Sequence, residues 1–257
     1  MQYPRMNALQ VLQAGFDAYR KFVRNFNKLI LKKQLEDKEI PSRSDDLHSI
    51  KIHKCLIKGS KELVILSTLK DVPFFTQLLS YSYRMELENP HLTLFVAKES
   101  MDLNRYTTEI KCKWRKNQIL FIALSLLIML DYLMKHNILH RDIHPENIFI
   151  DQHGYMKLTE FSNACFNTGA VCEKVGDIMF MSPEMAHGQH YSYEVDMWSV
   201  GVVLYWLVEI SLPFGKFNKG MDEGKYLEDM LQKSVWKIFK FHKIYRLNLV
   251  KREEKID

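Results

Sequence analysis

The stretch Ile138-Leu-His-Arg-Asp-Ile-His-Pro-Glu-Asn-Ile-Phe-Ile150 decides the fold of this 257-residue chain. It carries one carboxylate, Asp142, and one amide, Asn147, five positions apart. Before it, apolar residues recur at helical spacing over 117–136, which predicts a long helix. After it, residues 148–158 predict a strand-rich hairpin. A polar phrase of this kind between an apolar helix and a hairpin is improbable by chance.

Three further phrases follow in a set order. They are Lys157-Leu-Thr-Glu-Phe-Ser162, Met181-Ser-Pro-Glu184 and Asp196-Met-Trp-Ser-Val-Gly201. Together with His140-Arg141-Asp142 and Asn147, they resemble the motifs of protein kinases in the order that this family keeps. The resemblance covers roughly residues 48–238 and is strongest from 117 to 215.

The small-lobe half of the resemblance is most similar to AGC-type Ser/Thr kinases, in particular ribosomal S6 kinase and its kinase-like relatives. The residues that carry it are Glu62-Leu-Val-Ile-Leu66, Pro73-Phe-Phe-Thr-Gln-Leu-Leu-Ser-Tyr-Ser-Tyr83 and Leu92-Thr-Leu-Phe-Val96. This alignment implies a gatekeeper near Val96 and an adenine-binding hinge at 97–99.

Strand signals precede helix signals along the chain, which predicts an α+β fold. We expect strands at 48–56, 75–84 and 91–97 with a helix at 60–69, and later helices at 117–136, 192–209 and 222–238. The resemblance implies a two-lobed kinase-like fold with a reduced N-lobe and a mostly helical C-lobe. The predicted organisation is an N-terminal amphipathic helix and linker (1–47), a truncated N-lobe and hinge (48–99), a C-lobe (100–238) and a basic tail (239–257).

The resemblance implies phosphoryl transfer from ATP to a protein hydroxyl. This reaction needs a carboxylate that accepts the hydroxyl proton and oxygen ligands that hold Mg²⁺. Asp142 would be the base, within the catalytic phrase that also contains Arg141 and His140. Asn147 and Glu160 would be the metal ligands.

ATP would be held by a lysine paired with a helix carboxylate and by the hinge. Lys51 and Glu62 are the candidates for the pair, and the hinge candidates are Val96, Lys98 and Glu99. Lys51 lies only eleven residues before Glu62, a shorter interval than the family usually has, and Lys54 competes for the role. Both lysines, and a helical Glu62, also suit an exposed surface.

Several positions depart from the family pattern. Before residue 140 the chain has only Gly15 and Gly59, so a glycine-rich loop that could approach nucleotide phosphates is missing. Glu160 replaces the metal-binding aspartate, and its extra methylene moves the carboxylate in a site where Mg²⁺ tolerates little geometric error. Ser162 replaces a glycine, and His144 replaces a lysine near the γ-phosphate. Together these changes predict slow or absent catalysis.

The activation segment also differs. Asp177 replaces a threonine that normally bridges the catalytic aspartate, and Glu173 occupies the usual phosphothreonine position. A fixed carboxylate there pairs with Arg141 in one interpretation and is a solvated loop residue in the other. The first interpretation predicts a segment that is ordered without phosphorylation.

Both ends of the chain are basic and amphipathic. Apolar residues recur over 7–35, and the stretch 236–249 combines aromatic and basic residues. Packing on the domain, contact with a membrane surface and docking of a partner are all open for these ends. The family pattern also asks for an arginine to pair with Glu184, and Arg246 is the candidate.

The composition argues against several classes of protein. With 47% hydrophobic and 26% charged residues the chain can build a core, and a net charge of +5 is too mild to indicate a nucleic-acid partner. Four cysteines without metal or disulfide spacing suit a reducing compartment. The apolar runs 119–130 and 200–208 are shorter than the roughly 18–20 residues that span a bilayer. We therefore expect a cytoplasmic protein, with nuclear access left open.

Two functions from different classes follow. The favoured one is a regulatory pseudokinase that acts on a protein partner, with ATP and Mg²⁺ as its cofactors if it binds them. The alternative is an active ATP- and Mg²⁺-dependent Ser/Thr kinase with a protein substrate, supported by the intact Asp142 and Asn147. A minor alternative is a trafficking adaptor that acts through the helix at 7–35.

Overall fold

A computed structural model describes residues 48–53, 56–84, 91–99, 101–109, 114–151, 154–218 and 220–230. The predicted helix at 7–35, the linker that follows it, the tail at 239–257, Lys54 and Arg246 lie outside these residues. Contacts divide the chain into two compact units whose segments alternate along the sequence. Unit 1 comprises residues 1–113, 120–125 and 145–160, and unit 2 comprises 114–119, 126–144 and 161–257. The domain boundaries at 47, 99 and 238 stay predictions.

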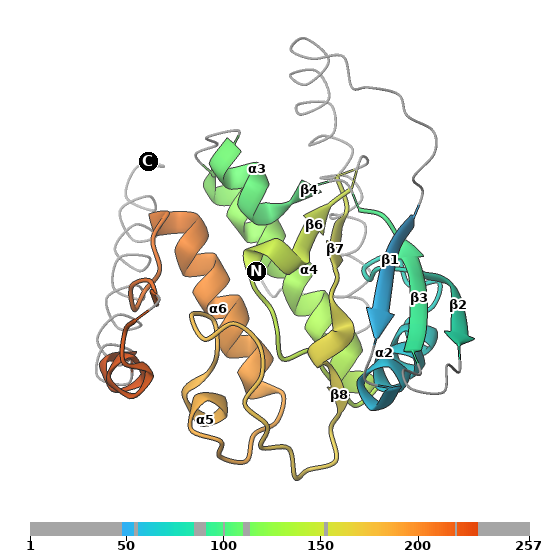
Figure 1. The fold of residues 1–257 in the computed structure, drawn as a ribbon. Helices are drawn as coiled ribbons and strands as arrows, with labels where there is room; N and C mark the ends of the chain where they lie inside the picture. Colours follow the sequence, from blue (N-terminus) through green and yellow to red (C-terminus); the bar gives the residue numbers. More distant parts are fainter. Residues whose placement is uncertain are drawn as a thin grey trace, which may run out of the picture. The chain divides into compact units, whose positions relative to one another are not determined.

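The first sheet of unit 1 has three antiparallel strands in the order β1-β3-β2 (Figure 1). Its strands are β1 (His48–His53), β2 (Leu78–Arg84) and β3 (His91–Ala97), and helix α2 (Leu56–Thr68) contacts all three. Along β3, Leu92, Leu94 and Val96 are buried while the residues between them are half-exposed, as expected for a strand with one covered face. The three strands and the helix are confirmed within a few residues of their predicted ends.

A second antiparallel sheet of unit 1 has the order β4-β6-β7. Its strands are β4 (Met101–Asp102), β6 (Ile148–Ile150) and β7 (Met156–Leu158), and a single 3₁₀ turn, η1 (Pro145–Asn147), precedes β6. The predicted hairpin is confirmed, and Gly154 turns it with a φ of 80°. Helix α3 (Leu103–Glu109), which the sequence did not predict, contacts β4, η1 and β6.

Helix α4 (Lys116–Lys135) confirms the long apolar helix. It contains neither glycine nor proline, and its first turn is closed by the Gln118 side chain, which accepts the Arg115 amide at 2.8 Å. One face is buried through Ile122, Leu126 and Leu133. Residues 120–125 belong to unit 1 and the rest of the helix to unit 2. Among the described helices, α4 is the one long and apolar enough to cross a membrane, a test that core helices of soluble proteins also pass.

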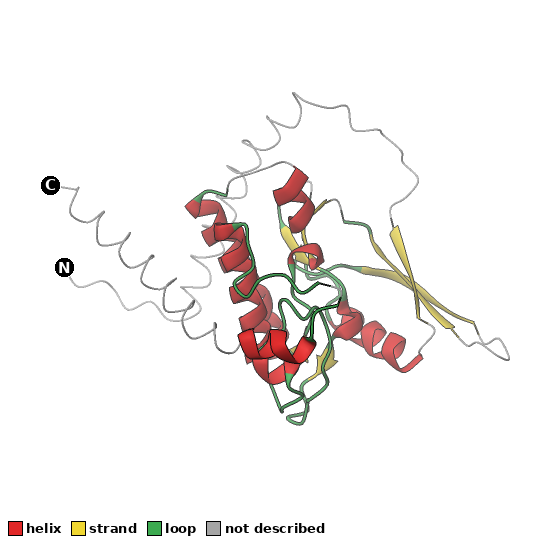
Figure 2. Ribbon diagram, turned by 60° about the vertical axis from the view of Figure 1, so that its left-hand side comes forward, coloured by secondary structure: helices red, strands yellow, loops and turns green. Residues whose placement is uncertain are grey.

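Unit 2 contains most of α4, a two-stranded ladder and the remaining helices. Figure 2 shows the helices of the described residues in red and the strands in yellow. The ladder pairs β5 (Ile138–Leu139) with β8 (Cys165–Phe166), the 3₁₀ turn η2 spans Phe161–Asn163, and the helices are α5 (Pro183–Ala186) and α6 (Glu194–Glu209). Helix α6 agrees with the predicted 192–209. Residues 223–230 are also helical, which confirms the first half of the helix predicted at 222–238. The mixture of helices and small sheets is the predicted α+β class.

Candidate active site

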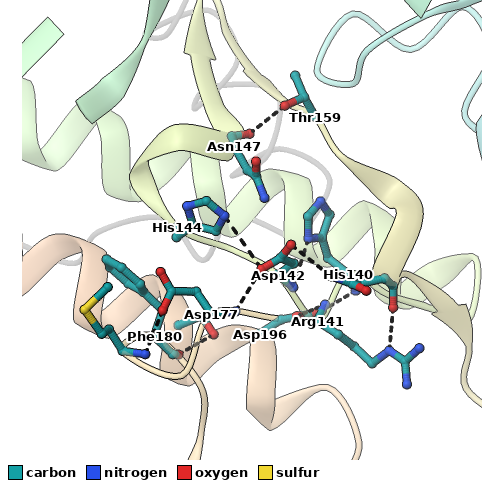
Figure 3. Close-up of polar contacts among 12 residues, drawn as sticks. His140, Arg141, Asp142, His144, Asn147, Thr159, Asp177, Phe180 and Asp196 are labelled. Atoms are coloured by element: carbon teal, nitrogen blue, oxygen red, sulfur yellow. Dashed lines mark hydrogen bonds and ion pairs between the residues drawn. The ribbon is translucent and has the colours of Figure 1, made fainter. Parts of the chain in front are cut away.

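Asp142, the predicted base, lies in unit 2 with both carboxylate oxygens engaged. Oδ1 accepts the backbone amide of Asp177 at 3.1 Å, and Oδ2 accepts the Asn163 side-chain amide at 3.0 Å. The ring Nε2 of His144 lies 3.6 Å from Oδ1 (Figure 3). The Asp142 carboxylate is therefore held in one orientation by donors from the activation segment, which we define as residues 161–184.

Asp196, in the first turn of α6, holds the loop that carries Asp142 through hydrogen bonds to its backbone. Its two carboxylate oxygens accept the backbone amides of His140 and Arg141, each at 2.8 Å. Burial raises the pKa of Asp196, and His140 together with these two amides acts in the opposite direction. The His140 ring is buried edge-on against Phe161, with ring centroids 4.8 Å apart, and its Nδ1 accepts the Asp142 amide at 3.3 Å. His140 thus positions the loop rather than facing solvent.

Arg141 confirms the predicted contact with Glu173. Its Nη1 lies 3.0 Å from Glu173 Oε2, and the same nitrogen donates to the Tyr191 hydroxyl at 3.1 Å. The Tyr191 hydroxyl in turn donates to the Glu173 carbonyl at 2.5 Å. The Arg141 Nε donates to the Asn163 carbonyl at 2.7 Å. These bonds fix a residue whose backbone is left-handed, with a φ of 66°, a conformation that persists only where surroundings determine it.

The activation segment is tied at several further points inside unit 2. Gly176 approaches the loop so closely that a Cβ there would lie 2.4 Å from the Arg141 carbonyl oxygen. The Asp177 carboxylate accepts the Met179 amide at 2.9 Å, and the Asp177 backbone amide donates to Asp142. Lys174 forms an ion pair with Glu223. The segment is therefore ordered by contacts that need no added phosphate.

Lys51 lies in unit 1 between two carboxylates. Its ammonium nitrogen is 2.9 Å from Glu62 Oε1 and 3.0 Å from Glu160 Oε1. The short interval between Lys51 and Glu62 is no obstacle, because β1 and α2 are consecutive elements and contact each other. The Glu62 side chain is fully buried and that of Glu160 is 44% exposed. Glu160 has a left-handed backbone, with a φ of 61°.

Asn147 ends η1 and is buried. Its backbone carbonyl accepts the amide of Thr159 at 3.0 Å and the Thr159 hydroxyl at 3.2 Å (Figure 3). Because Thr159 immediately precedes Glu160, these bonds anchor the two predicted metal ligands to the same hairpin of unit 1.

At the predicted hinge, Val96 is buried on β3 and Lys98 is exposed. Both carboxylate oxygens of Glu99 lie 3.1 Å from the Lys157 ammonium of β7. Burial raises the pKa of Glu99, and Lys157 opposes the shift. Glu99, at the predicted hinge, thus forms an ion pair with Lys157 inside unit 1. The nucleotide contacts of Val96, Lys98 and Glu99 stay predictions.

The predicted metal ligands suit Mg²⁺ in type but not in arrangement. Mg²⁺ prefers hard oxygen donors in near-octahedral geometry, which an amide and a carboxylate can supply. Here, however, the Glu160 carboxylate is held against the Lys51 ammonium. No group of three or more His, Cys, Asp or Glu side chains in the described part of the chain is placed to hold a metal. Engaged by Lys51, the Glu160 carboxylate does not fit its predicted role as a Mg²⁺ ligand in this arrangement, and the metal role of Asn147 stays a prediction.

The structure brings together two predicted groups: Lys51 with Glu62 and Glu160 in unit 1, and Asp142 with Arg141 and His140 in unit 2. Sequence reasoning missed the parts played by Asn163, Tyr191 and Asp196. Asp196 opens the phrase at 196–201, so its position was marked and only its contact was not foreseen. No comparable signal marks Tyr191.

Comparisons with known proteins agree with this geometry. The family model described as protein kinase domain matches residues 22–253. The cGMP-dependent protein kinase of Toxoplasma gondii is 36% identical over 116 residues, which cover 45% of this chain and 12% of that protein. Human serine/threonine-protein kinase 32B is 32% identical over 164 residues, covering 60% and 38%. Ribosomal protein S6 kinase 2 alpha of Gallus gallus is 27% identical over 205 residues, covering 76% and 26%.

The chain thus spans between about an eighth and two fifths of the length of these relatives. Their names include Ser/Thr kinases and ribosomal S6 kinase, which supports the AGC-related resemblance. The catalytic phrase, the ordered activation segment and the family match over most of the chain agree with one another. The chain belongs to the protein kinase family, with the α+β, two-lobed fold of that family and with AGC-related Ser/Thr kinases among its relatives.

Proposed function

We propose that this chain is a kinase-derived regulatory domain in which phosphoryl transfer from ATP to a protein hydroxyl is weak or lost. The observation that carries the proposal is the ion pair between Glu160 and Lys51 at 3.0 Å. It engages at once the carboxylate expected to bind the metal and the ammonium expected to hold the nucleotide phosphates. A kinase site needs both groups facing the nucleotide.

Two further substitutions support the proposal. The lysine near the γ-phosphate is replaced by His144, whose ring contacts Asp142 and lies 5.9 Å, between centroids, from Phe180. A histidine does not supply the fixed positive charge of a lysine at the place where negative charge develops. The sequence before residue 140 also lacks the glycines that let a loop cover the phosphates.

The domain would act through a protein partner, and we place it in the cytoplasm. The ordered activation segment provides a surface whose shape does not depend on phosphorylation, because Glu173 supplies the charge that Arg141 needs. Imaging of a tagged full chain in cells tests the location, and a membrane or nuclear signal would contradict it.

An active Ser/Thr kinase is the second candidate. It is favoured by Asp142, which is present and oriented by Asn163 and Asp177, and by the Arg141–Glu173 pair, which orders the segment. These are features that a catalytic loop needs and a purely structural domain does not.

Radiolabel transfer to a generic Ser/Thr substrate decides between the two. The full chain is assayed with ATP and Mg²⁺ beside an Asp142→Asn variant and a Glu160→Asp/Ser162→Gly double variant. We expect wild type to transfer no more label than Asp142→Asn. Wild-type turnover that Asp142→Asn abolishes contradicts the proposal and establishes the kinase. Turnover by the double variant alone assigns the defect to the altered metal-binding phrase.

A further inference from the structure

Lys51 already has a negatively charged partner in the place where a kinase presents its lysine to the nucleotide. Its ammonium bridges Glu62 and Glu160, and its side chain is only 18% exposed. Glu62 is fully buried and belongs to the small lobe's helix α2. Glu160, at 44% exposed, is the partner that faces solvent and can move away.

The length of the Glu160 side chain matters for this contact. An aspartate at the same position would end one methylene earlier, more than an ångström short of the present carboxylate. The backbone at Glu160 is fixed, because Thr159 is bonded to the Asn147 carbonyl at 3.0 and 3.2 Å. The extra methylene therefore gives the reach to Lys51 without any change in the hairpin.

We propose that Glu160 is a built-in competitor for the phosphates of a nucleotide, so that the site takes up a nucleoside di- or triphosphate without a divalent cation and only by displacing Glu160 from Lys51. This inference rests on the proposed function, since it assigns to the same site a binding role in place of catalysis. It reverses the usual duty of this position: the carboxylate neutralises the lysine and does not bind the metal.

The charges support displacement rather than permanent closure. Water screens the 44% exposed carboxylate of Glu160 more strongly than the buried carboxylate of Glu62, so Glu160 contributes less to holding Lys51 than Glu62 does. Partly exposed ion pairs are weak and are exchanged at small free-energy differences. A phosphate group, with more charge and more acceptor oxygens than a carboxylate, is a suitable replacement.

Calorimetric titration of ATP into the full chain in EDTA tests the proposal. The variants are Glu160→Gln, which removes the competing charge at constant shape, and Glu109→Gln, the same change at an exposed residue of α3 that pairs with Arg105. We expect Glu160→Gln to bind metal-free ATP about three- to tenfold more tightly than wild type, and Glu109→Gln to match wild type. Equal affinity in all three proteins, or no binding by any of them, overturns the inference.

The same titration with Mg²⁺ in place of EDTA tests whether Glu160 binds the metal. If Mg²⁺ tightens ATP binding by wild type but not by Glu160→Gln, Glu160 is a metal ligand and the inference is overturned. Equal effects of Mg²⁺ on the two proteins support it.

A nucleotide-free readout follows Lys51 directly. Acylation by an amine-reactive reagent, located by peptide mass spectrometry, reports how available the ammonium is. We expect Lys51 to be acylated several-fold faster in Glu160→Gln than in wild type, with Lys157, paired to Glu99, as the internal reference. An unchanged rate at Lys51 counts against the competitor role. An unchanged acylation rate would not decide the proposed function, because label transfer tests that function and Lys51 acylation does not.

Discussion

At the scale of single residues, Asp196 links helix α6 to the catalytic loop through two backbone amides at 2.8 Å. Asp196→Asn replaces one acceptor oxygen with an NH₂ group that faces an amide donor. Because both groups are buried, we expect the free energy of unfolding to fall by about 1–3 kcal/mol. Urea denaturation measures it, with Asp131→Asn on the exposed side of α4 as the matched control. Equal stability of the two variants would show that the Asp196 contacts contribute nothing.

Glu99 gives a pH dependence with a definite sign. Burial raises its pKa above 4.5, so the folded protein keeps the proton to a higher pH than the unfolded chain does. The free energy of unfolding therefore falls as the pH rises from about 4.5 through the raised pKa. In Glu99→Gln this contribution is absent. Urea midpoints between pH 4.5 and 7.5 should show wild type losing stability relative to the variant as the pH rises, and a trend of the opposite sign would contradict the shift.

The residues of the site show what sequence can and cannot foresee. Asp142, Arg141 and Asn147 were identifiable because a catalytic loop is contiguous and its order is distinctive. The short spacing between Lys51 and Glu62 does not predict their ion pair, which forms because β1 and α2 are consecutive elements that contact each other. The contact of Glu160 with Lys51 joins residues 109 positions apart, and no local pattern encodes such a distance.

At the scale of secondary-structure elements, the sequence likewise predicts some elements and not others. The long helices α4 and α6 were predictable because each has several turns of apolar periodicity, whereas α3 has seven residues, fewer than two turns. The sequence does not predict the paired strands β5 and β8, because two residues are too few to show an alternation of apolar and polar side chains. What defines them is a partner far away in the chain.

The activation segment offers a sharp test at the scale of an element. Gly176 and Gly215 have nearly equal φ values of 89° and 86°, but an added Cβ would meet the Arg141 carbonyl at Gly176 and nothing within 4 Å at Gly215. Both alanine variants have the same backbone strain, so their difference reports the close approach alone. We expect Gly176→Ala to be destabilised by at least about 1 kcal/mol more than Gly215→Ala.

Amide hydrogen exchange of the activation segment in the same two variants shows where the destabilisation lies. Faster exchange of residues 171–180 in Gly176→Ala, with Gly215→Ala unchanged, is the expected pattern. Identical stabilities and exchange rates in the two variants would mean that the segment does not depend on its contact with the catalytic loop.

At the scale of the whole molecule, the two units are interleaved in the chain and both take residues from α4. A helix that serves two cores couples their unfolding, since neither core can release its part of the helix alone. The three tryptophans in the described part of the chain, Trp114, Trp198 and Trp206, lie in unit 2, so their fluorescence reports that unit. Leu94, fully buried in β3, belongs to unit 1.

We therefore expect Leu94→Ala to lower the denaturation midpoint seen by tryptophan fluorescence together with that seen by circular dichroism, for a loss of about 2–5 kcal/mol. Val64→Ala, at a 51% exposed position of α2, serves as the control and should change little. A fluorescence midpoint that stays at the wild-type value would show that the units unfold independently.

The pair between Arg141 and Glu173 has a consequence in time rather than in space. A phosphate on a threonine is added by one enzyme and erased by another within minutes, whereas Glu173 is installed by the ribosome and lasts as long as the polypeptide. No phosphatase can reset it. As far as this one ion pair is concerned, the order of the segment changes only when the protein is made or degraded.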